Sequence, residues 1–137
     1  MSFKIELDHI GIATPSLEGN SFFKLLGLGD AGTEEVVTEK VKVGFFDTDN
    51  SARIELLKPT SEDSPIAKFM DKRGPGIHHI CFRVQGIEDI AKRLKEAGVQ
   101  LINEEPRMGA HHCKVVFIHP KSTGGVLVEL SEKVSHE

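Results

Sequence analysis

The sequence predicts an α+β fold made of two copies of one unit, which runs strand, helix and then further strands. Three pairs of resembling segments predict it, because they occur in the same order along the chain. The pairs begin at Asp8 and His78, at Lys42 and Lys114, and at Ile54 and Val128, with shifts of 70, 72 and 74 residues. A shift that grows so slowly needs only short loop insertions, so the chain is predicted to contain a duplication.

The chain length and the amino-acid composition favour one globular domain over residues 1–137. The predicted modules cover approximately 4–60 and 75–134, with a connector helix at approximately 65–73. A net charge of −4 argues against a phosphate-backbone grip on nucleic acid, and no apolar run is long enough to span a membrane. The first residues have no apolar leader segment, so we expect a cytoplasmic protein.

Local patterns predict the elements of the first copy. Leu7–Thr14 is a β-branched and apolar run, which is typical of a strand. Ser16 can cap a helix that ends near Gly27. Further strands are expected at 36–46 and 52–57.

Ser64 followed by Pro65 predicts an N-cap and first turn for the connector helix, which Gly74 would end. The second copy repeats the pattern, with a strand at Ile77–Val84 and then apolar residues at helical spacing from Ile87 up to Gly98. The strands expected after that helix are 99–103, 114–119 and 125–130.

Strand alternation separates apolar residues from possible metal ligands. Four of the strands carry an apolar face suited to packing on helices, formed by Ile10, Ile12, Ile54, Leu56, Ile80, Phe82, Val128 and Leu130. The opposite face of each strand carries one histidine or glutamate, and the histidines have mostly small neighbours there. These four residues are His9, Glu55, His79 and Glu129. The pattern predicts a cupped sheet with room inside the cup.

Two carboxylates inside such a cup would repel each other and lose hydration, and a divalent cation resolves both costs. The repeat makes His9 equivalent to His79, and Glu55 to Glu129, so a pseudo-twofold axis could bring all four together. The mixed nitrogen and oxygen donors suit Zn, Co, Ni or Mn. Taken singly, each residue is more often a core or solvent-facing side chain, and their separations form no local motif.

Longer stretches then bring in a family resemblance. LDHIGIA from Leu7, ARIELLKP from Ala52, SPIAKFMDKRGPGIHHICF from Ser64, GVQLINEEPRMGAHH from Gly98 and HPKSTGGVLVEL from His119 resemble the methylmalonyl-CoA epimerases of the vicinal oxygen chelate superfamily. The resemblance runs through nearly the whole chain. It implies paired βαβββ modules that form a cupped mixed β-sheet around a metal site, and commonly a homodimer.

Residue by residue, the resemblance places the metal ligands on His9, Glu55, His79 and Glu129. It implies metal-dependent epimerisation of methylmalonyl-CoA, an acyl-CoA substrate, by proton transfer at the carbon alpha to the thioester. We assign one proton-transfer role to Glu129. Some epimerases carry a second acid/base glutamate where this chain has Val43, which cannot move a proton.

Two other functions stay open at this point. A glyoxalase I-like lyase acting on a glutathione hemithioacetal would use the same His, Glu, His, Glu set. A non-catalytic module that binds small molecules need not keep four ligands. The cations Arg107, Lys114 and Lys121 are candidates for the CoA tail, and the loop histidines His111 and His112 are candidates for substrate contact.

Overall fold

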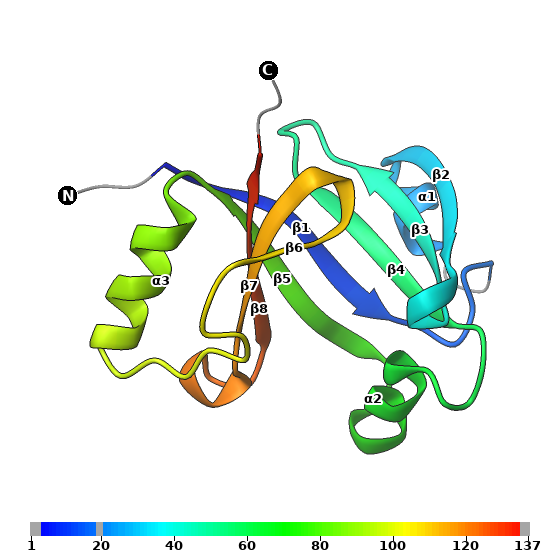
Figure 1. Ribbon diagram of the computed structural model, residues 1–137. Helices are drawn as coiled ribbons and strands as arrows, with labels where there is room; N and C mark the ends of the chain where they lie inside the picture. The colour runs from blue at the N-terminus through cyan, green and yellow to red at the C-terminus, as the bar shows by residue number, and fades with distance from the viewer. Residues whose placement is uncertain (1–3, 19–20, 135–137) are drawn as a thin grey trace. The chain divides into compact units, whose positions relative to one another are not determined.

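The computed structural model describes residues 4–18 and 21–134, and the chain divides into two compact units. One unit spans His9–His78, and the other combines the residues before His9 with those from His79 onward. Both units follow the order strand, helix, three strands, as the labels in Figure 1 show. The α+β class and its paired βαβββ modules are therefore confirmed, whereas the prediction that 1–137 form one domain stays a prediction.

The His9–His78 unit has four strands in the order β2-β3-β4-β1. Its β1 and β4 are parallel, and the other pairs are antiparallel. Its elements are β1 (Ile5–Ala13, which pairs with β4 from His9 onward), α1 (Phe22–Leu26), β2 (Gly29–Val36), a 3-10 turn (Val37–Glu39), β3 (Val41–Asp47) and β4 (Arg53–Pro59).

Two sequence predictions in this unit were wrong in their boundaries. The first helix begins at Phe22, with Ser21 at its N-cap, and not after Ser16. The strand expected over 36–46 is interrupted by the 3-10 turn and by Lys40, whose φ is +53°. The strand β2 was missed because its residues are almost all exposed, so no alternation of apolar and polar residues marks it.

Helix α2 (Pro65–Arg73) is the last helix of the His9–His78 unit. Fully buried Ser64 is its N-cap, and the Ser64 Oγ accepts a hydrogen bond from the Ile66 backbone N–H at 3.2 Å. Ile66 packs with Val43 and Leu57 in one buried cluster. This cluster lies on the same sheet face as Glu55, because Val43 pairs with Leu57 and Phe45 pairs with Glu55. Part of the face that we predicted to be open is therefore covered.

The other unit has its strands in the order β5-β8-β7-β6, with β5 and β8 parallel. Its elements are β5 (Gly76–Val84, which pairs with β8 from His79 onward), α3 (Ile87–Glu96), β6 (Arg107–Met108), a 3-10 turn (Ala110–His112), β7 (Cys113–Ile118), a second 3-10 turn (Pro120–Ser122) and β8 (Leu127–Lys133).

Helix α3 covers the apolar face of this unit beside β7 and β8 (Figure 1). Ile87 and Val116 are fully buried there, and Leu130 is 7% exposed. The predicted apolar face is confirmed in this unit. Among the described residues, no helix is long and apolar enough to cross a membrane.

The strand expected at 99–103 is wrong. Only Leu101 forms an isolated bridge, to Ile118. The Asn103 side chain takes over the pairing, because its Oδ1 accepts from the Phe117 N–H at 2.8 Å and its Nδ2 donates to the Val115 carbonyl at 2.9 Å. The backbone pairing ends at Ile102, whose N–H donates to the Phe117 carbonyl at 2.8 Å, and the Asn103 side chain continues it.

Candidate metal-binding and proton-transfer site

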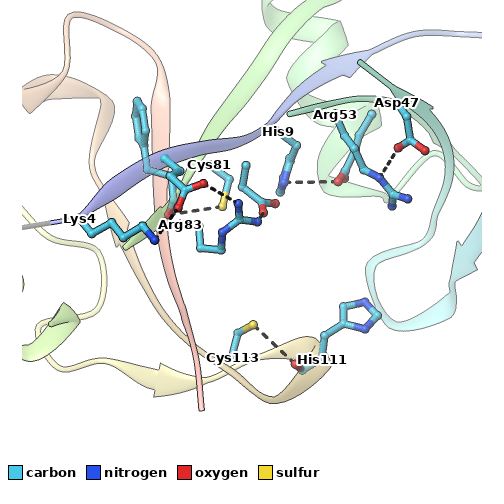
Figure 2. Close-up of polar contacts among 12 residues, drawn as sticks. Lys4, His9, Asp47, Arg53, Cys81, Arg83, His111 and Cys113 are labelled. Atoms are coloured by element: carbon cyan, nitrogen blue, oxygen red, sulfur yellow. Dashed lines mark hydrogen bonds and ion pairs between the residues drawn. The ribbon is translucent and has the colours of Figure 1, made fainter. Parts of the chain in front are cut away.

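His9 and Glu55 form a close pair within the His9–His78 unit. Parallel β1 and β4 place Gly11 opposite Glu55, so His9, two residues earlier, shares the face of Glu55. The His9 Nδ1 lies 3.3 Å from the Glu55 Oε2, and the two side chains are 13% and 17% exposed (Figure 2). We call the sheet face that carries a histidine and a glutamate the His/Glu face of its unit.

An arginine and a phenylalanine flank Glu55 on this face. Phe45 is the direct cross-strand neighbour of Glu55. The Arg53 guanidinium carbon lies 5.3 Å from the centre of the Phe45 ring, within the range of a cation–π contact. Arg53 also donates from Nε to Asp47 Oδ1 at 2.7 Å (Figure 2). Its positive charge is therefore already neutralised.

His79 and Glu129 form the equivalent pair in the other unit. Cys81 on β5 is opposite Glu129 on β8, so His79 shares the face of Glu129. A ligand nitrogen of His79 and a carboxylate oxygen of Glu129 lie within 4.8 Å of one another, and both residues are half-buried. Cys81, which is directly opposite Glu129 on this face, is 1% exposed and packs as a small core residue.

The four predicted ligands therefore fall into two His/Glu pairs, one in each unit. A half-buried carboxylate beside an imidazole has the donors that Zn²⁺ and similar cations accept, with nitrogen and oxygen ligands near 2 Å. The chemistry of the donors fits a divalent metal.

Val43 was expected to be unable to transfer a proton, and its surroundings agree with that. It is 5% exposed and packs in the apolar cluster with Ile66 and Leu57. Lys42, its neighbour, is exposed and points to the opposite face, because strand residues alternate. Neither residue offers an acid or base on the His/Glu face.

The other histidines occupy different surroundings. The His78 ring packs edge-on against Phe69 of α2, with ring centres 5.0 Å apart, and burial lowers the pKa of His78. His111 and His112 are exposed, and both have left-handed backbones, with φ of +58° and +57°. Such backbones are strained for residues other than glycine.

Lys114, one candidate for the CoA tail, is engaged elsewhere. It pairs with Glu88 at the start of α3 and lies opposite Glu132 on β8, which is the α3 side of the sheet. The pairing raises the pKa of Lys114 and lowers the pKa of Glu88. Lys114 therefore does not reach the His/Glu face of its unit.

Comparison with known proteins agrees with the fold. Residues 8–117 match the model of the glyoxalase/bleomycin resistance protein/dioxygenase superfamily. The chain is 42% identical to an ethylmalonyl-CoA/methylmalonyl-CoA epimerase of Cereibacter sphaeroides over 130 residues, covering 92% of this chain and 96% of that protein.

Two solved structures show the same likeness. A hypothetical protein from Bacillus halodurans has a TM-score of 0.86 and 46% identity, with 98% of each chain covered. A variant of Streptomyces coelicolor methylmalonyl-CoA epimerase in complex with 2-nitronate-propionyl-CoA has a TM-score of 0.78 and 33% identity, covering 98% of this chain and 100% of that one.

Proposed function

The chain belongs to the methylmalonyl-CoA epimerases of the glyoxalase/bleomycin resistance protein/dioxygenase superfamily, and from this membership we propose that it epimerises methylmalonyl-CoA at C2. The observation that carries the proposal is the His/Glu pair in each unit, 3.3 Å apart for His9 and Glu55 and within 4.8 Å for His79 and Glu129. The identity of 42% over 96% of the Cereibacter sphaeroides epimerase supports the same substrate.

We propose that His9, Glu55, His79 and Glu129 together hold one divalent metal ion, with Zn, Co, Ni and Mn as candidates. The support is chemical: two neutral imidazoles and two carboxylates balance the charge of such an ion. When bound, the ion would polarise the thioester oxygen and stabilise the enolate.

The proposed reaction moves one proton off C2 and returns one to the opposite face. Glu129 takes the C2 proton as its C–H bond breaks, and the electron pair moves into the enolate of the thioester. A second acid then gives a proton to the other face of C2, and the C–H bond forms again with inverted configuration. Glu55 or a metal-bound water would be this acid, since Val43 is apolar and Asp47 is held by Arg53.

Proton exchange at C2 of methylmalonyl-CoA in heavy water, followed by NMR with added Co²⁺ or Zn²⁺, tests this function. We expect rapid exchange with the wild-type protein and a loss of at least about a hundredfold in Glu129→Gln, in line with the usual contribution of a general base. Glu105→Gln is the matched control, because the Glu105 side chain is 83% exposed and pairs with Lys95 on the surface.

Two results would overturn the proposal. No exchange with metal-loaded protein would remove the epimerase, and turnover of the methylglyoxal–glutathione adduct would then establish the lyase that shares this ligand set. Near-normal exchange in Glu129→Gln would remove the role of Glu129. The homodimer and the cytoplasmic location stay predictions.

A further inference from the structure

A second arginine lies over a phenylalanine on the His/Glu face of the unit that contains Glu129. Phe117 on β7 is the direct cross-strand neighbour of Glu129. Arg107 on β6 pairs with Val115, two residues before Phe117, so all of these side chains share one face. The Arg107 guanidinium carbon lies 5.8 Å from the centre of the Phe117 ring. The stack therefore stands beside the proposed base.

The two stacked arginines, Arg107 and Arg53, differ in their ion pairing. Arg53 donates to Asp47, and Arg83 donates to Glu6 and Asp8. Arg107 is exposed and has no ion pair with any residue in the described ranges 4–18 and 21–134. Within these described ranges its guanidinium donates no hydrogen bond either, so its N–H donors are available to a ligand. A planar fork of free donors is suited to a carboxylate or a phosphate.

Cross-strand neighbours have Cβ atoms about 5 Å apart. The Arg107 guanidinium carbon lies 5.8 Å from the centre of the Phe117 ring, and Phe117 is the direct neighbour of Glu129, so a single aromatic side chain separates the Arg107 charge from Glu129. An anion bound by Arg107 is therefore close to the carbon that Glu129 would deprotonate. In methylmalonyl-CoA the free carboxylate is attached to that carbon, whereas the phosphates lie beyond the whole pantetheine arm.

We propose that Arg107 binds the free carboxylate of the acyl group and so selects malonyl-type thioesters over simple acyl-CoA. This inference rests on the proposed function. Phe117 supports it by holding the guanidinium over the His/Glu face, which lowers the entropy lost when the fork closes on an anion.

The test is calorimetric binding to Arg107→Gln with three ligands. These are methylmalonyl-CoA, propionyl-CoA, which lacks the carboxylate, and methylmalonyl-pantetheine, which lacks the terminal phosphates. We expect methylmalonyl-CoA and methylmalonyl-pantetheine each to lose about tenfold or more in affinity, as for a charge-assisted hydrogen bond. The affinity of propionyl-CoA should change less than about twofold. Arg53→Gln is the matched control, and its effect on all three ligands should stay below about threefold because Asp47 already neutralises that charge.

Equal losses for both CoA ligands with none for methylmalonyl-pantetheine would overturn the proposal and assign Arg107 to a phosphate. Unchanged binding of all three ligands would also overturn it. The inference and the function fail separately. If Arg107 binds the carboxylate but no C2 exchange occurs, the role of Arg107 stands and the epimerase function is refuted. If C2 exchange occurs and does not depend on Arg107, the epimerase function stands and the role of Arg107 is refuted. Unfolding temperatures equal to wild type establish that each variant is folded.

Discussion

Glu132 stabilises the start of α3 from the neighbouring strand. Its Oε1 accepts from the Ile87 N–H at 2.9 Å, and its Oε2 accepts from the Gly86 N–H at 3.1 Å. Gly86 is the N-cap of α3 and has no side chain, so the carboxylate of Glu132 satisfies donors that the helix leaves free. It also lies at the positive end of the helix dipole.

Replacing Glu132 with alanine should lower the free energy of unfolding by about 2 kcal/mol. Each bond to a charged group contributes about 1.5–3 kcal/mol, and half-burial reduces the two together to roughly 2 kcal/mol. With an unfolding entropy of about 2.1 cal/mol/K per residue, this corresponds to a fall in Tm of about 7 °C. Glu132→Gln keeps one acceptor and should lose about half as much.

Urea unfolding followed by circular dichroism measures this difference. The control is Glu105→Ala, whose side chain is 83% exposed and pairs with Lys95 at 3.2 Å, and which should change stability by less than about 0.5 kcal/mol. If Glu132→Ala and Glu105→Ala unfold at the same urea concentration, the carboxylate does not stabilise the helix and the reasoning is refuted.

Three further predictions concern the caps, the pH dependence and the metal. Ser64→Ala removes the α2 cap and should cost about 1 kcal/mol in urea unfolding, whereas Ser61→Ala should cost less. Hydrogen bonds from Lys40 and Ser61 lower the pKa of Asp63 from 3.8 to about 2. The stability that this adds is complete above pH 4 and is lost as the pH falls toward 2, so Asp63→Asn should flatten the stability curve in that window. Zn²⁺ at a hundred times its Kd should raise the Tm by roughly 9 °C through binding to the folded state, and a similar rise in His79→Ala would contradict the assigned ligands.

Long apolar runs and capping residues made much of the fold predictable. β1, β5 and α3 are marked by β-branched alternation or helical spacing, and α2 by Ser64, Pro65 and Gly74. The elements that were missed or misplaced lack such marks. β2 is exposed along almost its whole length, and β6 has only two residues. At 99–103 the backbone forms only the bridge at Leu101, and the Asn103 side chain makes the next bonds to β7, which no pattern of hydrophobicity reveals.

The candidate site divides in the same way. The duplication predicted that His9 is equivalent to His79, and Glu55 to Glu129. In each unit the histidine and the glutamate of this set lie close together. The stacks of Arg53 on Phe45 and of Arg107 on Phe117 could not be predicted, because they depend on cross-strand register. Phe45 and Phe117 do occupy matching places in the repeat, and this is the feature through which the stacks could have been found.

The two glutamates of β8 show why register decides function. Glu129 and Glu132 lie three residues apart and therefore face opposite sides of the sheet. Glu132 accepts hydrogen bonds from two backbone N–H groups at the start of α3 and therefore has a structural role. Glu129 lies beside His79 and Phe117 on the His/Glu face. Val43 supplies no second base, so in the proposed epimerase Glu129 and, as one candidate, Glu55 would serve both as metal ligands and in proton transfer. Metal binding and proton transfer would then depend on the same carboxylates, so replacing Glu55 or Glu129 with glutamine should lower metal affinity and C2 exchange together.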